Sequence, residues 1–525
     1  MVTSNKIKNR SFFGIKLNAE NAVLFSCIIF TLIIGLYPVT FGFWRDELYY
    51  IALSKHLAWG YVDVPPLMPF CIAIIRKLFG ESVFAMHLMP AIINAIILIL
   101  TREIVKKLGG NLFSQVLTLL CLLSASTFIF LGSNIIYDCF DHLFWALCLY
   151  LLILLLTSEN KKYWLFLGVF VGLGLMSKFG MLWLMFGIML AMPFTKERRY
   201  FCTWQFWIGG VIALVILSPY LIWIVQTHFL TFEYFANYTK SSAVITLSSF
   251  FIEQIKSMNP FTFPIWILGL YYFLFDNTGK KFRLFGLAYI FIAAVVIIQQ
   301  AKYYTILPIF PVLFAGGAVF IEKFTCKFRV VNRAAVIYAF MIVISGLIIM
   351  PSVRPIFPVD FTIKYLNYTG LFKSGSKMST EKYSLGLLPQ IYADSFGWQE
   401  MTAEVARIYY SLPETERKNT FIYTNNYGEA SAIYFYGEKY NLPMPISQHL
   451  QYYVWGYRNA TDNFTLITVG RSRKSLTSSF KEVTQVGAVY NKYAVPYENG
   501  PIYLCRGFKE ESLQKGWEKG KGMRM

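Results

Sequence analysis

The sequence predicts a polytopic α-helical membrane protein that carries an α/β domain outside the membrane at its C-terminal end. Of its 525 residues, 56% are hydrophobic and only 15% are charged, a composition too apolar for a soluble protein of this length. Apolar runs of membrane-spanning length recur up to residue 350, and Ser, Lys, Asn and Tyr become more frequent from Pro351 onward. We therefore expect a transmembrane domain over residues 1–350 and a soluble extracytoplasmic domain over residues 351–525.

Eleven membrane crossings are predicted from these runs. The run 164–194 is interrupted at Lys178, and basic clusters flank both of its ends. Because basic residues favour the cytoplasmic side, this stretch should enter and return as two short helices that meet at Lys178. The first run follows basic residues as in a signal peptide but lacks a small-x-small cleavage site, so we expect it to stay as a span. The runs lie near 22–42, 83–101, 112–132, 139–157, 164–194 (two crossings), 204–225, 261–275, 284–300, 305–321 and 334–350.

The distribution of charge predicts the orientation. The net charge is +19, and the basic residues fall mainly in short clusters between the runs and near the C-terminus. That pattern is typical of topology signals and lipid contacts, so we exclude nucleic-acid binding. With eleven crossings, every cluster between runs falls on the side of the N-terminus. The prediction is a multi-pass protein of the cytoplasmic membrane with its N-terminus in the cytoplasm and its C-terminal domain outside.

The C-terminal domain is expected to mix strands with helices. Short β-type runs occur at 421–423 and 465–469, and an amphipathic helical pattern covers 399–412. Residues 515–525 predict a loose basic tail.

The loop 43–82, after the first span, gathers charged and aromatic residues in the first polar gap of the chain. If its first part is helical, Asp46, Tyr49 and Tyr50 share one face. A carboxylate at a semi-buried interface can act as a general base, because such a position raises its basicity. The alternative is that Asp46 and Glu47 only cap or solubilise the helix. An apolar side suited to a helix lying flat at the membrane interface is formed by Leu48, Ile51, Ala52 and Trp59.

Three further acids are tentative metal ligands. Asp63 precedes a proline pair that should start the next helix. Asp138 and Asp141 lie three residues apart at the outer mouth of the fourth span, with His142 beside them. Acids at membrane depth usually serve a function, and a hard divalent cation prefers oxygen ligands. The alternative for each of them is a favourable place at a helix start.

Two lysines are candidate contacts for an anion on the outer side. Lys178 lies at the predicted elbow, and Lys302 precedes Tyr303 and Tyr304 in another outer turn. An ammonium together with phenol donors suits a phosphate group. The alternative for Lys178 is that its ammonium only extends toward lipid headgroups.

Several motifs occur along the chain, and the last two lie in the C-terminal region. They are Asp-Glu-Leu-Tyr-Tyr (46–50), His-Leu-Ala-Trp-Gly-Tyr-Val-Asp-Val-Pro-Pro-Leu (56–67), Gly-Leu-Met-Ser-Lys (174–178), Met-Asn-Pro (258–260) with Pro-Ile-Trp (264–266), Lys-Tyr-Tyr (302–304) with Leu-Pro-Ile-Phe-Pro (307–311), Phe-Gly-Trp-Gln-Glu-Met (396–401) and Asn-Tyr-Gly-Glu-Ala (426–430). Together they resemble one known family, the bacterial branch of the dolichyl-phosphate-mannose protein mannosyltransferase and aminoarabinose (lipid A) transferase superfamily. The C-terminal motifs resemble the soluble domain that one subgroup of this family carries.

The resemblance implies a GT-C glycosyltransferase of the inner membrane, which passes a sugar from a polyprenyl-phosphate donor, with inversion, to an acceptor in the periplasm. It implies that Asp46 is the general base or acceptor-orienting acid and that Asp63 is a divalent-metal ligand. Asp141 matches the second acidic position, with Asp138 as the rival one turn away. Glu47 is assigned as a secondary catalytic acid. The donor phosphate is assigned to Lys178, Lys302, Tyr303, Tyr304, Arg45 and Tyr49.

The donor sugar and the acceptor stay open. Val64 stands where the aminoarabinose enzymes have Lys, and no Arg follows Glu47, so the resemblance does not extend to their sugar. The acceptor is lipid A, another lipid, a glycan or a protein. A transporter or flippase of lipid-linked sugars is the alternative function, because intramembrane charges also mark transport paths. A third interpretation treats 351–525 as a partner-binding module on a membrane scaffold.

Overall fold

A computed structural model describes the chain over residues 11–12, 15–16, 18–37, 41–241, 246–325, 329–376, 385–457, 464–509 and 513–522. The chain forms two compact units. The first unit contains Met1–Tyr37, His87–Leu217 and Ile245–Arg354, and the second contains Pro38–Met86, Ser218–Val244 and Pro355–Met525. The second unit therefore joins the first outer loop to the C-terminal region. The domain boundary expected at residue 350 stays a prediction.

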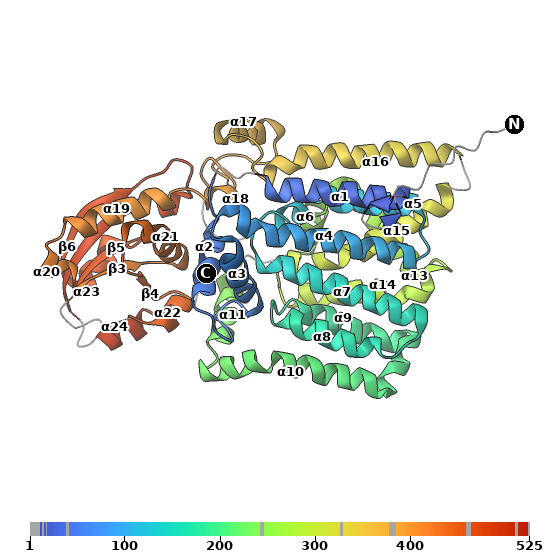
Figure 1. The fold of residues 1–525 in the computed structure, drawn as a ribbon, viewed down its shortest axis with the longest axis horizontal. Coiled ribbons are helices and arrows are strands. Elements are labelled where there is room, and N and C mark those ends of the chain that lie inside the picture. The colour runs from blue at the N-terminus through green and yellow to red at the C-terminus, as the bar shows by residue number, and fades with distance from the viewer. Residues whose placement is uncertain are drawn as a thin grey trace. The chain divides into compact units, whose positions relative to one another are not determined.

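The first unit is a bundle of helices that run roughly parallel in Figure 1. α4 begins and α10 ends in residues of the second unit. The helices are α1 (Ala19–Leu36), α4 (Val83–Lys107), α5 (Leu112–Ser124), α6 (Ser126–Leu131), α7 (Tyr137–Ser158), α8 (Tyr163–Leu175), α9 (Met181–Ala191), α10 (Trp204–Gln226), α12 (Leu247–Ser257), α13 (Phe263–Leu274), α14 (Arg283–Ile298), α15 (Phe310–Thr325) and α16 (Arg329–Ile349). Two short strands, β1 (Ser11–Phe12) and β2 (Ile15–Lys16), pair antiparallel.

The polytopic character predicted from the sequence is confirmed. Within the described residues, seven helical segments are long and apolar enough to cross a membrane. Four shorter apolar helices account for the other predicted crossings, at Leu112–Ser124, Tyr163–Leu175, Met181–Phe194 and Pro260–Leu274. Eleven crossings and their orientation stay a prediction. The seven segments are Ala19–Leu36, Val83–Lys107, Tyr137–Ser158, Trp204–Gln226, Gly279–Ile298, Tyr303–Phe324 and Arg333–Ser352.

The elbow predicted at Lys178 is present, because α8 ends at Leu175 and α9 begins at Met181. Gly180 allows this turn to pack closely. A Cβ atom at that position would lie 2.5 Å from Asp141 Oδ2. The sequence Ser-Lys-Phe-Gly therefore ends one helix and leaves room for an acid of α7 at the start of the next.

Small residues let neighbouring helices of this unit approach closely. A Cβ atom on Gly269 of α13 would lie 2.0 Å from the carbonyl oxygen of Leu313 in α15, and one on Gly317 would lie 1.9 Å from that of Ile265. In a membrane, where burial of apolar surface does little to hold helices together, such close backbone contact supplies the packing energy. We infer that α13 and α15 form a fixed pair within the bundle.

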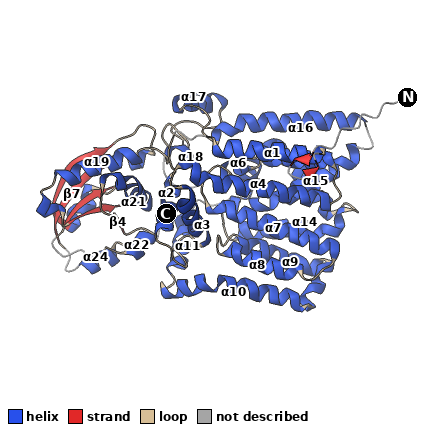
Figure 2. Ribbon diagram, viewed as in Figure 1, coloured by secondary structure: helices blue, strands red, loops and turns tan. Residues whose placement is uncertain are grey.

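The second unit contains a five-stranded sheet, whose strands are red in Figure 2, together with a set of helices. Its helices are α2 (Arg45–Lys55), α3 (Leu67–Phe79), α11 (Leu230–Ser241), α17 (Val359–Thr369), α18 (Gln390–Ala393), α19 (Trp398–Ser411), α20 (Glu414–Arg417), α21 (Tyr427–Tyr436), α22 (Gln451–Trp455), α23 (Arg473–Ser479) and α24 (Leu513–Lys519). Its strands are β3 (Thr420–Thr424), β4 (Ile446–Ser447), β5 (Thr465–Val469), β6 (Phe480–Val489) and β7 (Gly500–Phe508).

The sheet is mixed, with the strand order β4-β3-β5-β7-β6. β3 pairs parallel with β4 and β5, and β7 pairs antiparallel with β5 and β6. Successive side chains of a strand point to opposite faces. Tyr423 and Leu466 accordingly join one hydrophobic core, while their neighbours Ile422 and Ile467 are buried on the other face. The predicted α/β character is confirmed, including both strands and the helix expected over 399–412.

The end of the chain differs from the loose tail that was predicted. Residues Leu513–Lys519 form α24, and Trp517 is only 8% exposed in the core beside the sheet. Its ring stacks on Tyr453 with centroids 5.9 Å apart, and Gln448 Nε2 donates to its backbone carbonyl at 2.9 Å. The prediction weighed the charge of the segment and overlooked how much apolar surface one tryptophan buries.

α2 is also more deeply buried than was expected. The helix predicted in the first outer loop is present, but Leu48, Ile51 and Leu53 are fully buried, as are nearly all of its other residues. Trp59 lies beyond the end of the helix and is 64% exposed. The expectation that only one face of this helix is apolar and covered is therefore wrong, and its place at the membrane interface stays a prediction. α2 is a core helix of the second unit, packed against α3 and α21.

Candidate active site

Asp46 lies in the first turn of α2, where the positive end of the helix dipole favours a carboxylate. Tyr427, the first residue of α21, donates a hydrogen bond from its hydroxyl to Asp46 Oδ1 at 2.6 Å. Arg45 Nε lies 3.7 Å from the same oxygen, and 21% of the Asp46 side chain is exposed. Burial raises the pKa of Asp46, while Arg45 and Tyr427 lower it. The result is a carboxylate that is more basic than one in water yet is held in place by two partners.

Arg45 is fixed by the C-terminal part of the same unit. Its Nη1 donates to the hydroxyl of Tyr497 at 2.6 Å, and its Nη2 lies 3.6 Å from Asp394 Oδ2. Its backbone N–H donates to the carbonyl of Asp394 at 3.0 Å. The guanidinium also lies 5.5 Å from the centre of the Tyr427 ring. Arg45 lies beside the candidate base, where its charge faces the carboxylates of Asp46 and Asp394. Its predicted contact to the donor phosphate stays a prediction.

Asp63 belongs to the same cluster as Asp46. Tyr49, one turn after Asp46, donates its hydroxyl hydrogen to Asp63 Oδ1 at 2.7 Å, and its ring centre lies 4.8 Å from that of Tyr427. Burial raises the pKa of Asp63 to about 7, despite the hydrogen bond from Tyr49. The predicted helix start after the proline pair is confirmed, since α3 begins at Leu67.

Glu47 has a structural contact. Its Oε2 accepts a hydrogen bond from the backbone N–H of Trp44 at 3.0 Å, and the side chain is buried. A glutamate in the first turn that bonds back to the residue before the helix stabilises the helix start. This contact fits the capping alternative for Glu47, and its secondary catalytic role stays a prediction.

The motif Asn-Tyr-Gly-Glu-Ala at the start of α21 carries a second pair of acids. Glu429 Oε2 accepts from the backbone N–H groups of Asn425 and Asn426 at 2.7 and 3.2 Å, and Asn426 Nδ2 donates to Glu498 Oε1 at 3.3 Å. Glu429 and Glu498 are buried in hydrogen-bonding contact with each other. Burial raises the pKa of both carboxyls above the ordinary value of 4.5, so one carboxyl keeps its proton at a pH where a free glutamate has lost it.

Glu498→Gln should reduce the loss of stability that the protein shows as pH rises. A folded-state pKa above the unfolded value means that the folded protein holds more protons, so stability falls from about pH 4.5 upward through the raised pKa values. We expect the thermal midpoint of the purified full chain to exceed that of the wild type at pH 8, by roughly 1 °C for each kcal/mol recovered, with little difference at pH 5. The control is Glu482→Gln, at an exposed position on β6. Parallel pH curves for Glu498→Gln and the wild type would contradict this expectation.

A separate charged cluster lies in the first unit, at the Lys178 elbow. Lys178 Nζ makes an ion pair with Asp138 of α7, and both side chains are largely buried. The ammonium lies 5.1 Å from the centre of the Tyr137 ring and 5.3 Å from that of Tyr304. Tyr304 belongs to a 3-10 turn over Tyr303–Ile309 that Lys302 precedes. Lys178 and the segment 302–304 are both assigned to the donor phosphate, and Tyr304 of that segment lies beside the Lys178 ammonium.

Asp141 and its neighbours form the inner part of this cluster. Asp141 is 1% exposed, and its Oδ1 accepts from Trp145 Nε1 at 3.1 Å. Its other oxygen lies against Gly180 at the elbow. His142 Nδ1 contacts the backbone carbonyl of Asp138 at 3.0 Å. Asp138 thus faces the lysine, whereas Asp141 is held by an indole on its own helix, one turn further in.

Residues 63–223 match the family model described as dolichyl-phosphate-mannose-protein mannosyltransferase. The predicted family is confirmed over this stretch. It contains Asp63, Asp138, Asp141 and Lys178 and begins after Asp46. The predicted enzyme class, a glycosyltransferase of this family, is confirmed by the same match.

Two solved structures are similar to nearly the whole chain. The apo state of ArnT from Cupriavidus metallidurans is 12% identical, with a TM-score of 0.60 over 93% of this chain and 98% of that one. The same protein bound to undecaprenyl phosphate is 13% identical, with a TM-score of 0.53 over 92% and 97%. At such identities the likeness shows the fold, and the predicted GT-C architecture agrees with it. No curated protein has a matching sequence.

The described residues offer no binding site for the predicted divalent metal. Among the described residues, no three His, Cys, Asp or Glu side chains are grouped so that they could hold a metal ion. Asp138 already makes an ion pair with Lys178, and Asp63 accepts a hydrogen bond from Tyr49. Asp63 lies in the second unit, and Asp138 and Asp141 lie in the first. We therefore derive no step of the reaction through a metal.

Sequence reasoning missed the groups that hold Asp46 and Arg45. Tyr427 is 381 residues away from Asp46, and Tyr497 is 452 residues away from Arg45. The available signal is the motif at 426–430, which resembles the family's soluble domain but does not by itself indicate a chemical role. The ion partner of Lys178 was also missed, because Asp138 lies 40 residues earlier on another helix.

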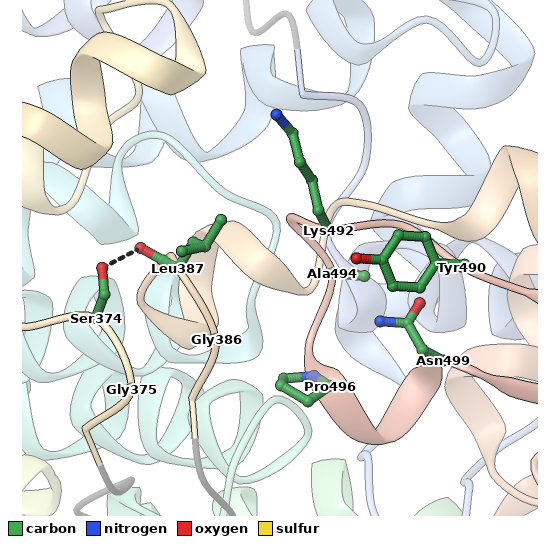
Figure 3. Close-up of a pocket in the computed structure, with 9 residues that line it drawn as sticks. All are labelled: Ser374, Gly375, Gly386, Leu387, Tyr490, Lys492, Ala494, Pro496 and Asn499. Carbon is green, nitrogen blue, oxygen red and sulfur yellow. Dashed lines mark hydrogen bonds between the residues drawn. The ribbon is translucent and has the colours of Figure 1, made fainter.

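A cavity of 600 Å³ in the second unit has a different lining (Figure 3). Among the described residues around it none is acidic, and Lys492 is the charged side chain. Ser374 Oγ donates to the carbonyl of Leu387 at 3.1 Å across one wall. The described part of this lining offers no carboxylate as a base, so we place the candidate reaction at Asp46. The lining consists of Ser374, Gly375, Gly386, Leu387, Tyr490, Lys492, Ala494, Pro496 and Asn499.

Proposed function

We propose that the protein transfers a sugar from a polyprenyl-phosphate donor, with inversion, to a hydroxyl-bearing acceptor on the extracytoplasmic side of the membrane. The observation that carries this proposal is the carboxylate of Asp46, which is partly exposed, raised in pKa, and held between Tyr427 and Arg45. The family match over 63–223 supports a phosphate-linked sugar donor. The similar fold of ArnT with bound undecaprenyl phosphate supports a polyprenyl carrier.

In the proposed step, the acceptor oxygen attacks the anomeric carbon of the donor sugar. A new carbon–oxygen bond forms on one face while the bond from that carbon to the phosphate oxygen breaks on the other, and polyprenyl phosphate leaves with the bonding electrons. The proton of the acceptor hydroxyl goes to Asp46. Burial makes this carboxylate a better base near neutral pH than a free aspartate.

The departing phosphate needs positive charge, because negative charge builds up on its oxygen as the bond breaks. We propose that Lys178 supplies that charge, with Tyr304 beside it as a phenol donor. Asp138 holds the ammonium in place until the donor arrives. Lys302, next to the turn that carries Tyr304, is proposed as a second contact to the same phosphate.

The experiment that tests the proposal also names the substrates. In a deletion strain of the native host, mass spectrometry of envelope lipids and glycans should find one component that lacks a sugar and an excess of unspent polyprenyl-phosphate sugar. The acceptor class, which we leave as lipid A, another lipid, a glycan or a protein, is read from the component that changed.

Purified full-length protein should then form the missing product when it is added to membranes of the deletion strain, which contain both unspent substrates. A transporter or flippase would move the carrier between leaflets without making this product. An unchanged envelope, or restoration in cells with no product formed by the purified protein, would overturn the proposed transfer.

A further inference from the structure

We propose that Tyr427 is a positioning residue for Asp46, so that the C-terminal region completes the catalytic base of the first outer loop. This inference rests on the proposed function. The hydroxyl of Tyr427 donates to Asp46 Oδ1 at 2.6 Å, and both residues lie in the second unit. The hydrogen-bond donor to Asp46 thus comes from α21, which is far from the loop 43–82 in the sequence.

The phenol of Tyr427 is held by its surroundings. The backbone N–H of Tyr427 donates to His449 Nδ1 at 3.2 Å, and the centres of the two rings lie 5.4 Å apart. On another side its ring lies against Tyr49, with centroids 4.8 Å apart. Asn426 caps the helix by accepting from the backbone N–H of Glu429 at 2.9 Å. A phenol fixed in this way can hold one carboxylate oxygen at a set place.

Gly428 makes the approach of α2 to α21 possible. A Cβ atom at this position would lie 2.5 Å from Arg45 Cγ. Arg45 could not then pass α21 to reach Asp394 and Tyr497, which bind its guanidinium. The sequence Asn-Tyr-Gly-Glu thus supplies in order a helix cap, the donor to Asp46, space for Arg45, and the buried acid Glu429.

The direction of the hydrogen bond matters for the chemistry. Tyr427 and Arg45 Nε both approach Oδ1 of Asp46, which assigns Oδ2 to the acceptor's proton. A donated hydrogen bond also stabilises the ionised carboxylate against the effect of burial. The charged and titratable groups around Asp46 are Arg45 and Glu47 on its own helix, and Tyr49, Asp63, Tyr427 and Asp394. Among them, Tyr427 and Arg45 favour the charged base.

Tyr427→Phe removes only the hydroxyl and keeps the ring that packs on Tyr49 and His449. We expect kcat for transfer to fall about 10-fold, because a hydrogen bond to a charged group is lost. The acid limb of the kcat/KM profile should move up by about one pH unit, because Asp46 then needs a higher pH to ionise. The assay uses purified full-length protein added to membranes of the deletion strain, with product followed by mass spectrometry.

The matched control is Tyr434→Phe, on the same helix. The Tyr434 hydroxyl bonds to His56 Nε2 at 3.0 Å, so this variant also removes one partly buried phenol contact between α21 and the first outer loop. Its pH profile should coincide with that of the wild type. In the Asp46→Asn background, adding Tyr427→Phe should cause no further loss, because the two groups act through one carboxylate.

The outcomes separate this inference from the function on which it rests. A Tyr427→Phe enzyme with the wild-type rate and profile would overturn the positioning role, as would a lower yield of folded protein with an unmoved profile. Normal transfer by Asp46→Asn would instead overturn the base assigned under the proposed function. A shifted limb in Tyr427→Phe alone, with the control unmoved, supports the inference.

Discussion

Asp46→Asn is expected to lower the rate of sugar transfer by about 10³-fold, within the range that a general base contributes. Asparagine keeps the size of the side chain and can still accept the hydrogen bond from Tyr427, but it cannot take a proton from the acceptor. Protein should accumulate in the membrane at nearly the wild-type level, since the capping contact of Glu47 is untouched. Transfer is measured with deletion-strain membranes, and the amount of protein by immunoblot.

The matched control for this variant is Asp360→Asn. Asp360 Oδ1 also accepts a hydrogen bond from a tyrosine, Tyr493, at 2.7 Å, but this pair lies on an exposed part of the second unit. Transfer by Asp360→Asn should stay near that of the wild type. Equal activity of Asp46→Asn and Asp360→Asn would show that Asp46 has no part in the reaction.

Lys178→Met is expected to lower transfer by about 10²-fold, because one preorganised charge at the departing phosphate is lost. Methionine keeps an unbranched apolar stem at the elbow and removes the ammonium. Lys178→Arg should restore part of the activity, since it keeps the charge while changing its geometry. The loss should be visible in the apparent KM for the polyprenyl-phosphate donor as well as in kcat.

Stability has to be separated from chemistry in this variant. Without Lys178, Asp138 is left largely buried beside Tyr137, and removing one partner of a buried ion pair is destabilising. The double variant Lys178→Met/Asp138→Asn removes both charges, so it should recover the thermal midpoint without recovering transfer. Recovery of both would mean that Lys178 only neutralises Asp138.

Lys323→Met provides the matched control. Lys323 Nζ pairs with Asp276 Oδ1 at 2.6 Å and lies 5.0 Å from the centre of the Tyr272 ring, the same combination of groups in the same unit. The topology predicted from the sequence puts this lysine on the cytoplasmic side. Its loss should affect stability and leave the rate of transfer per folded molecule unchanged. An equal loss of transfer in both variants would contradict a specific role for Lys178.

Local patterns in the sequence predicted several helices and strands of both units. The apolar runs predicted the helices of the membrane part, and the interruption at Lys178 predicted the two short helices α8 and α9. The runs at 421–423 and 465–469 predicted β3 and β5. These features depend on the periodicity of apolar residues, on residues that end helices and strands, and on local hydropathy. A short segment of sequence contains all of this information.

Only the tertiary structure decided which groups surround each candidate side chain. Tyr427 reaches Asp46 and Tyr497 reaches Arg45 across more than 380 residues, and Asp138 reaches Lys178 between two helices. No local period encodes such pairings, because they depend on how distant elements pack. The buried Trp517 shows the same limit, since charge in the surrounding segment outweighed its apolar surface in the prediction.

The sequence by itself thus determined a polytopic membrane protein with a C-terminal α/β region, a resemblance to the mannosyltransferase family, and Asp46 as the acid to test first. The tertiary structure decided that this acid lies on a core helix packed against α21, with a phenol and a guanidinium on one of its oxygens. The physical reason is that a candidate base can be identified from one short segment. Its strength and orientation depend on burial and on donors that folding brings from the other end of the chain.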